Sequence, residues 1–530
     1  MKPLLNFCEN CGSKIKEITN FCIQCGNPFL SNFDKFDKSS SSAGLENNDI
    51  FKIGDFRDYF EYLINIPSNT EIYLFITNTS ILVEQLGEEE ALLIRSNILN
   101  RCGIKDNNCY LFFDFAKDFE SEILEWKYHV QLLNYNENIL KDRLGKIFSG
   151  FIIIGDNSVI PQAIFDDLTD TDANIESDSV YSTLSLHDPW VDQSALEFSR
   201  QVSRIPIGNS LLFEDIKRYW QNRDSIKLED ISTDLPFALS AKCWEDASQQ
   251  VLNEIGSGIV KTSPDLDHTT LMSVWNIYAP WHYFNVHGSS EEADWYGDYL
   301  GEYPIAFNPS LAKEIKVLNV IGVEACYGAK FIGLDTESSI LIAALKHLTV
   351  SFLGSSKIAF GPSTPPNSLA DVMIRDYLSG MRSGLTAGES HKLAQKALIS
   401  ALNDCTGDSS LIIKTLLSFN LFGDPTVRLI NSNRSNSINL DPLKVEIIDP
   451  LKLVRNAVDG SMGELQEKLQ NALSTLYPDI NGINPIISKY QTRYGEKYRW
   501  HWKTLNSGIM RHYIALTDNK GNISDILESK

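Results

Sequence analysis

The sequence lacks the features that mark several specialised classes of protein. No stretch approaches the roughly 18–20 consecutive apolar residues that cross a membrane. The opening residues contain no apolar core long enough for a secretory signal, so we expect a cytoplasmic protein. Positive charge is scarce: 47 Lys and Arg face 69 Asp and Glu, and the formal net charge is −22. Because nucleic-acid binding needs a basic surface, we do not expect a nucleic-acid partner.

The cysteines do not suit a disulfide framework, since there are nine, an odd number. Four of them form two Cys-x-x-Cys pairs separated by ten residues, each followed by Gly: Cys8, Cys11, Cys22 and Cys25. Four thiolates at this spacing bind one tetrahedral Zn²⁺ and leave no open position for catalysis. The metal would supply the folding energy that so short a segment lacks. We therefore predict a structural zinc ribbon over residues 1–30, used for docking or recognition.

A chain of 530 residues is too long for one hydrophobic core, and its composition changes at several points. Residues 31–49 are polar and Ser-rich without periodicity, which indicates a flexible linker. A second polar run begins at Asn431. We expect five segments: a zinc ribbon (1–30), a linker (31–49), an N-terminal α/β subdomain (50–230), a catalytic α/β subdomain (231–432) and a C-terminal α+β accessory domain (433–530).

Apolar runs of strand length alternate with amphipathic segments, which predicts an α/β fold with parallel sheets covered by helices. The expected strands are 72–77, 110–115, 151–155, 237–241, 282–286, 317–324, 357–360 and 426–430. The expected helices are 88–99, 120–133, 337–347, 368–381, 391–403, 411–418 and 462–476, and a hairpin follows at 513–527. Over 489–503 cationic residues interleave with aromatic ones. That pattern is typical either of a surface for bases or an acidic partner, or of core aromatics beside solvated charges.

Two of the apolar runs end in a reactive side chain close to glycine. The run that begins at Trp281 ends at His287 before Gly288, and the run that begins at Val317 ends at Cys326. Chemistry collects at the carboxyl ends of parallel strands, and a thiol beside an imidazole makes a nucleophile with its base. We therefore predict that Cys326 and His287 form a catalytic pair. The N–H groups of Gly288 and Cys326 would form the oxyanion hole.

The alternative is a core cysteine beside a chance histidine. Four other residues compete for these roles. His282 lies inside its apolar run, and His347 and His391 lie on expected helices. Cys243 also ends a strand, but it lacks a following Gly and is flanked by Trp244. We rank all four behind the pair.

Several motifs together resemble the gingipain-type, caspase-like cysteine peptidases. They are Val286-His-Gly-Ser-Ser, Glu324-Ala-Cys-Tyr-Gly and Leu421-Phe-Gly-Asp-Pro-Thr, with weaker likenesses at 155–161, 177–181 and 203–206. Residues 359–364 resemble the strand and loop that flank the specificity pocket of that family. The likeness covers roughly residues 50–430. It implies a caspase-like fold of two α/β subdomains and a cysteine endopeptidase.

The chain departs from the family pattern in two places. Val286 replaces a glycine before the histidine, and the acids expected after the first strand of the catalytic subdomain align only with Glu245 and Asp246. One of these acids would orient His287 or lie at the floor of the specificity pocket, where it would select Arg or Lys by charge pairing. The alternative is two solvated acids at a helix start.

The leading hypothesis is an intracellular cysteine endopeptidase that acts on protein or peptide substrates. Its activation would be regulated, with the zinc ribbon or the C-terminal domain binding a regulatory partner. By analogy with other caspase-like proteins, the pathway would be stress, defence or cell death. A catalytically silent scaffold that keeps the fold is the alternative, and an acyl- or amido-transferring enzyme is a third hypothesis.

Overall fold

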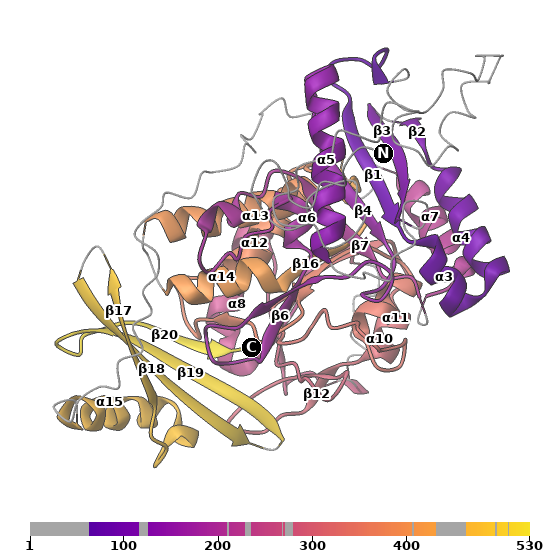
Figure 1. Cartoon of the computed structure of the whole chain (residues 1–530). Coiled ribbons are helices and arrows are strands. Elements are labelled where there is room, and N and C mark those ends of the chain that lie inside the picture. The colour runs from indigo at the N-terminus through magenta and orange to yellow at the C-terminus, as the bar shows by residue number, and fades with distance from the viewer. Residues whose placement is uncertain are drawn as a thin grey trace, which may run out of the picture.

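The computed structural model describes residues 63–430 and 463–530 (Figure 1). Short gaps in this description fall at 106, 116–125, 209–210, 228–234, 268, 271–278, 405–407, 493–494 and 507. The predicted zinc ribbon and both predicted linkers lie outside the described residues. No helix in the described part of the chain has the length and apolarity needed to span a bilayer.

One large sheet organises the protein, with the strand order β2-β3-β1-β4-β7-β16-β14-β13-β10-β8-β9. Neighbouring strands are parallel except at β2–β3 and β14–β16. In sheet order the strands are Gly103–Lys105, Asn108–Asp114, Glu71–Thr77, Gly150–Ile154, Gln201–Ile205, Phe419–Gly423, Thr349–Ser355, Asn319–Val323, Trp281–Asn285, Phe237–Ala241 and Lys261–Ser263. The predicted α/β class with a mainly parallel sheet is confirmed. The strands expected in two subdomains form one continuous sheet, joined where β7 pairs with β16.

Helices bury both faces of the central strands, since every residue of β4, β7, β16, β14, β13, β10 and β8 is buried. The main helices are α3 (Thr79–Leu86), α4 (Glu88–Leu99), α5 (Trp126–Leu144), α7 (Phe213–Asp224), α8 (Glu245–Ile255), α11 (Ile340–Lys346), α12 (Ala370–Arg382), α13 (Ala387–Asn403) and α14 (Ser409–Ser418). Helix α12 packs against α8 and α13, and it lies over β13.

Two expected strands are misplaced. Of the strand expected at 357–360, only Phe360 is in a strand, the short β15 (Phe360–Gly361); the large sheet takes β14 instead, because the β-branched and apolar run from Thr349 enters it directly after α11. The strand expected at 426–430 is β16, which begins as α14 ends at Ser418. The Gly-Asp-Pro turn therefore follows the strand, and the Val427 carbonyl then accepts a hydrogen bond from Ala387 at the start of α13.

A second, antiparallel sheet carries the C-terminal segment, shown in yellow in Figure 1. Its order is β15-β20-β19-β18-β17, and α15 (Gly463–Leu476) packs against it. In the same order the strands are Phe360–Gly361, Ile523–Ser529, Ile509–Asp518, Gly495–Asn506 and Ile486–Thr492. Trp500 and Trp502 of β18 are fully buried, so these aromatics of the cationic and aromatic stretch are core residues. Strand β15 lies in the chain between β14 of the large sheet and α12. Its pairing with β20 therefore brings the C-terminus, marked in Figure 1, close to the large sheet and its helices.

Candidate active site

The structure brings His287 and Cys326 to the same edge of the large sheet. Strands β10 and β13 are parallel neighbours, with Phe284 opposite Val323. His287 and Cys326 each lie three residues beyond this pair, so they follow neighbouring strand ends. The backbone at Gly288 passes so close to Cys326 that a Cβ there would overlap the Cys326 carbonyl oxygen. A glycine is required at this position for the two strand ends to approach.

A hairpin fixes His287 and supplies a carboxylate for its ring. The backbone of His287 exchanges two hydrogen bonds with Tyr296, of 2.9 and 2.8 Å, and the chain then turns to Asp298. The Asp298 Oδ2 lies 3.3 Å from the His287 Nε2, and both side chains are buried. The ring of Trp244 lies against His287 with centroids 4.3 Å apart. Two contacts therefore set the orientation of the imidazole.

Burial and the contact between His287 and Asp298 shift the pKa of each group in opposite directions. Burial lowers the pKa of His287, and the hydrogen bond to Asp298 acts against that shift. Burial alone would raise the pKa of Asp298, but its hydrogen bond to His287 and the charge of Arg511 bring it below its usual range. The Arg511 Nη1 lies 2.9 Å from the same Oδ2 atom that faces His287. Asp298 is thus ionised and shared between a histidine and an arginine.

The acids predicted for this role are elsewhere. Glu245 begins α8 and pairs with Lys242 at 2.7 Å, and its side chain is 42% exposed. Asp246 is exposed in the same first turn of α8. Both match the alternative interpretation of solvated acids at a helix start, where the helix dipole favours them. No local pattern in the sequence marks Asp298, because the strand that folds it back onto His287 is only two residues long, Trp295–Tyr296.

Cys326 is enclosed by the end of the chain. Its residue is 4% exposed, and its Sγ lies 3.6 Å from the Ala359 carbonyl oxygen. Burial raises the pKa of the thiol to about 12. Its backbone N–H donates a 2.9 Å hydrogen bond to the carbonyl oxygen of Lys530. A predicted oxyanion-hole donor therefore already holds a carbonyl group beside the thiol.

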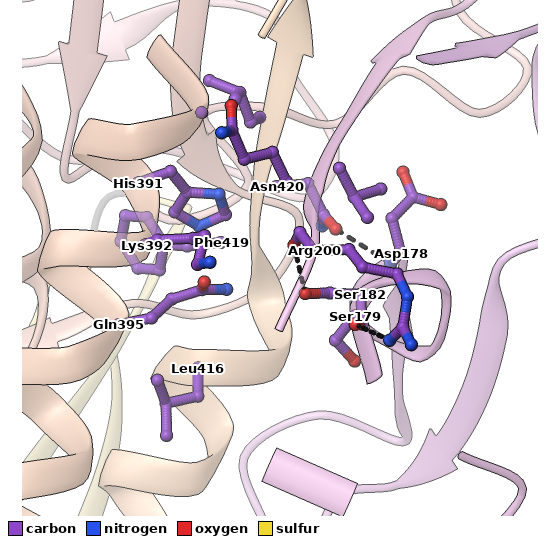
Figure 2. A pocket seen from close by; sticks show the side chains of 14 residues that line it. Asp178, Ser179, Ser182, Arg200, His391, Lys392, Gln395, Leu416, Phe419 and Asn420 are labelled. Atoms are coloured by element: carbon purple, nitrogen blue, oxygen red, sulfur yellow. Dashed lines mark hydrogen bonds between the residues drawn. The ribbon is translucent and has the colours of Figure 1, made fainter. Parts of the chain in front are cut away.

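Three of the competing residues are placed where they cannot serve Cys326. His282 is fully buried within β10 against the ring of Phe237. His347 follows α11, and its carbonyl accepts a hydrogen bond from Asn222 of α7. His391 faces a separate small cavity of about 20 Å³, which also meets Arg200 (Figure 2). That space holds about one water molecule, and burial lowers the pKa of His391 to about 4.

Cys243 lies closer to the site than the sequence suggested. The sulfur of Cys243 lies within 4.8 Å of a nitrogen of His287 and an oxygen of Asp298. Its backbone N–H donates to the Asp298 carbonyl at 3.1 Å. Arg511 already contacts the Asp298 carboxylate, which disfavours a cation among these three groups. The backbone N–H of Cys326 binds a carbonyl oxygen, that of Lys530, whereas the N–H of Cys243 is taken up by Asp298, so Cys326 has the better position to meet a carbonyl group.

A cleft of about 240 Å³ opens beside Cys326. Its walls come from the loop 289–293 that follows His287 and from residues 326–328 and 338–340. Lys530 approaches over β15, whereas this cleft opens beside the loop that follows His287. It offers room for the part of a chain that would follow the residue held at Cys326.

The sequence matches no family model and no curated protein. Among solved structures, the chain is similar to the Arg-specific cysteine proteinase gingipain R (RgpB), at 12% identity and a TM-score of 0.47, over 88% of this chain and 92% of that one. A structure described only as a protease has 11% identity, the same coverage and the same TM-score. The complex of Porphyromonas gingivalis RgpB pro- and mature domains has 11% identity and a TM-score of 0.44, over 86% and 92%.

Proposed function

We propose that this protein is a cysteine endopeptidase with Cys326 as nucleophile, His287 as acid and base, and Asp298 as the residue that orients His287. The observation that carries the proposal is the carbonyl group of Lys530, which the Cys326 N–H binds at 2.9 Å beside the thiol. A substrate peptide carbonyl that takes the place of the Lys530 carbonyl would be positioned for attack, and its developing negative charge would meet a preorganised donor.

The reaction follows from this placement. The thiol proton passes to His287, and the thiolate attacks the carbonyl carbon. The oxyanion is stabilised by the N–H groups of Cys326 and Gly288. The C–N bond then breaks as His287 gives its proton to the leaving amine, and a thioester remains. Water attacks the thioester, His287 takes a proton from it, and breakage of the C–S bond restores the thiol and releases the new carboxyl terminus.

Asp298 acts through the histidine. A carboxylate 3.3 Å from Nε2 stabilises the imidazolium formed when the thiol loses its proton. The open cleft beside the Ser289 loop supports cleavage within a chain, because it leaves room for residues after the scissile bond. The substrates are proteins or peptides, with a basic residue before the cleaved bond. The zinc ribbon and the C-terminal domain would regulate this activity inside the cell.

Digestion of a peptide library tests the proposal. Because Lys530 lies in the site, each variant is prepared both with Lys530 and with Lys530→Ala. We expect cleavage by the parent protein and by Cys243→Ala in at least one background, and none by Cys326→Ala. Equal cleavage by Cys326→Ala would assign the activity to another residue or to a contaminant. Absence of cleavage in both backgrounds would favour the silent scaffold.

A further inference from the structure

The last residues of the chain lie along the site as an added strand. Strand β20 pairs antiparallel with β15, with Ser529 opposite Phe360 and Glu528 opposite Gly361. The Lys530 N–H donates to the Ala359 carbonyl at 2.9 Å, and the Lys530 carbonyl accepts from Cys326. Strand addition is a common way for a groove to bind an extended peptide. Residues 528–530 thus take the place of the acyl side of a substrate.

The side chain of Lys530 fills a closed pocket. Its Nζ lies 3.2 Å from the Pro362 carbonyl oxygen, 3.4 Å from Asp371 Oδ1 and 3.8 Å from Glu324 Oε2. The ammonium also lies 4.5 Å from the ring of Trp244, in cation–π range. The three side chains of the Lys530, Glu324 and Asp371 group are all 0% exposed.

A cation between Glu324 and Asp371 lowers the cost of burying these two acids side by side. Among the described residues, neither oxygen of Asp371 nor the Oε2 of Glu324 accepts a hydrogen bond. Burial raises the pKa of Glu324, and the neighbouring Asp371 raises it further. A buried carboxylate is costly unless a counter-charge reaches it. The ammonium of a lysine supplies that charge in this pocket.

The pocket dimensions favour lysine over arginine. Gly361 forms one wall, and a Cβ at that position would come within 2.5 Å of the Lys530 Cε. Oxygens of Pro362, Asp371 and Glu324 close the far end around the ammonium. An ammonium is a compact group with three donors, whereas a guanidinium is planar and larger. The longer side chain would meet the closed end.

The C-terminal sheet also contacts Asp298, the carboxylate that orients His287. Arg511 of β19 contacts Glu528 of β20 at 2.9 Å and Asp298 at 2.9 Å. It therefore ties the strand in the groove to the carboxylate that faces His287. The positive charge of Arg511 beside Asp298 weakens the support that this carboxylate gives to an imidazolium. The C-terminal segment therefore both occupies the site and, through Arg511, partly neutralises the charge of Asp298.

We propose that residues 527–530 are an intramolecular inhibitor of this site, and that Glu324 and Asp371 select lysine as the residue before the scissile bond. This inference rests on the proposed peptidase function. It predicts that release of the tail both exposes Cys326 and reveals cleavage after lysine.

Two measurements on the full chain test the inference separately from the function. The first is the rate at which iodoacetamide alkylates Cys326, which needs no peptidase activity. We compare the parent with Lys530→Ala and Lys530→Met, and use Lys520→Ala as the matched control, since Lys520 is exposed on the β19–β20 turn. Because a tethered segment has a high effective concentration, we expect alkylation on the order of tenfold faster in both Lys530 variants and unchanged in the control. Equal rates in all four proteins would overturn the tail assignment.

The second measurement compares hydrolysis of matched peptides with Lys, Arg or Met before the scissile bond, in the Lys530→Ala protein. We expect preference for lysine, and its loss in Glu324→Gln and Asp371→Asn but not in Asp376→Asn, a control on the same helix. Preference for arginine, or no preference, would overturn the pocket assignment while the peptidase stands. Faster alkylation without any hydrolysis would leave the tail assignment intact and remove the proposed function.

Discussion

Replacement of Asp298 by Asn is the sharpest test of the catalytic arrangement. The change keeps the shape of the side chain and removes the negative charge 3.3 Å from the His287 Nε2. A hydrogen bond to a charged group contributes about 1.5–3 kcal/mol. Because Arg511 shares the same oxygen, we take about 2 kcal/mol, which corresponds to a loss of about 30-fold in kcat/KM.

The assay measures kcat/KM against pH in the Lys530→Ala background, which removes the side chain proposed to hold the tail in the site. Without the carboxylate the imidazolium is less stable and the pKa of His287 falls. Because the neutral imidazole accepts the thiol proton, the acidic limb of the profile should move to lower pH. Glu245→Gln and Asp246→Asn are matched controls, since both acids lie in the solvated first turn of α8, and they should leave the rate unchanged. If Asp298→Asn stays within about threefold of its parent at every pH, well short of the tenfold that 1.4 kcal/mol represents, Asp298 does not orient His287.

Three further predictions follow from other parts of the molecule. Gly288→Ala should lower kcat/KM by about 100-fold, because the new Cβ overlaps the Cys326 carbonyl oxygen and forces the strand ends apart, and a misplacement of about 1 Å can cost that much. An unchanged rate would contradict the close approach to Cys326. Urea unfolding should show a lower free energy of unfolding at pH 5 than at pH 7, because burial lowers the pKa of His129 to about 3 and that of His391 to about 4. The unfolded state therefore binds more protons below pH 6.5, and each histidine lowers the free energy of unfolding by about 2 kcal/mol at pH 5. Replacement of either histidine should reduce the difference between the two pH values. Elemental analysis should find one zinc per chain, and replacement of either Cys-x-x-Cys pair by serine should remove it. Chelation should leave kcat/KM unchanged because the predicted site is structural. Full zinc content in the serine variants would refute the predicted zinc ribbon.

The sequence by itself determined the local features of the site. Strand-length apolar runs that end at His287 and Cys326 are read directly from residue order, and glycine after a strand end marks a close backbone approach. The parallel α/β class followed from the same alternation, because a strand buried on both faces must be apolar throughout. The burial of Trp500 and Trp502 agrees with the interpretation of core aromatics for the same reason.

The acids of the site were decided only by the tertiary structure. An acid beside a strand end has the same sequence signature whether it meets a histidine or solvent, and this is why Glu245 and Asp246 were candidates for a role that the structure gives to neither. Asp298 reaches His287 because a bridge between His287 and Tyr296 folds the chain back. No periodicity in the sequence encodes that fold.

The lysine pocket depends on still longer connections. Asp371 lies on α12, Glu324 ends β13, and Lys530 arrives through the pairing of β20 with β15. The hydrogen bond between Lys530 and Pro362 joins residues separated by 168 positions. Local propensity fixes strands and helices because it acts over a few residues. Which buried charges meet is set by the packing of whole sheets, and that packing is what gives a pair of buried acids its counter-charge.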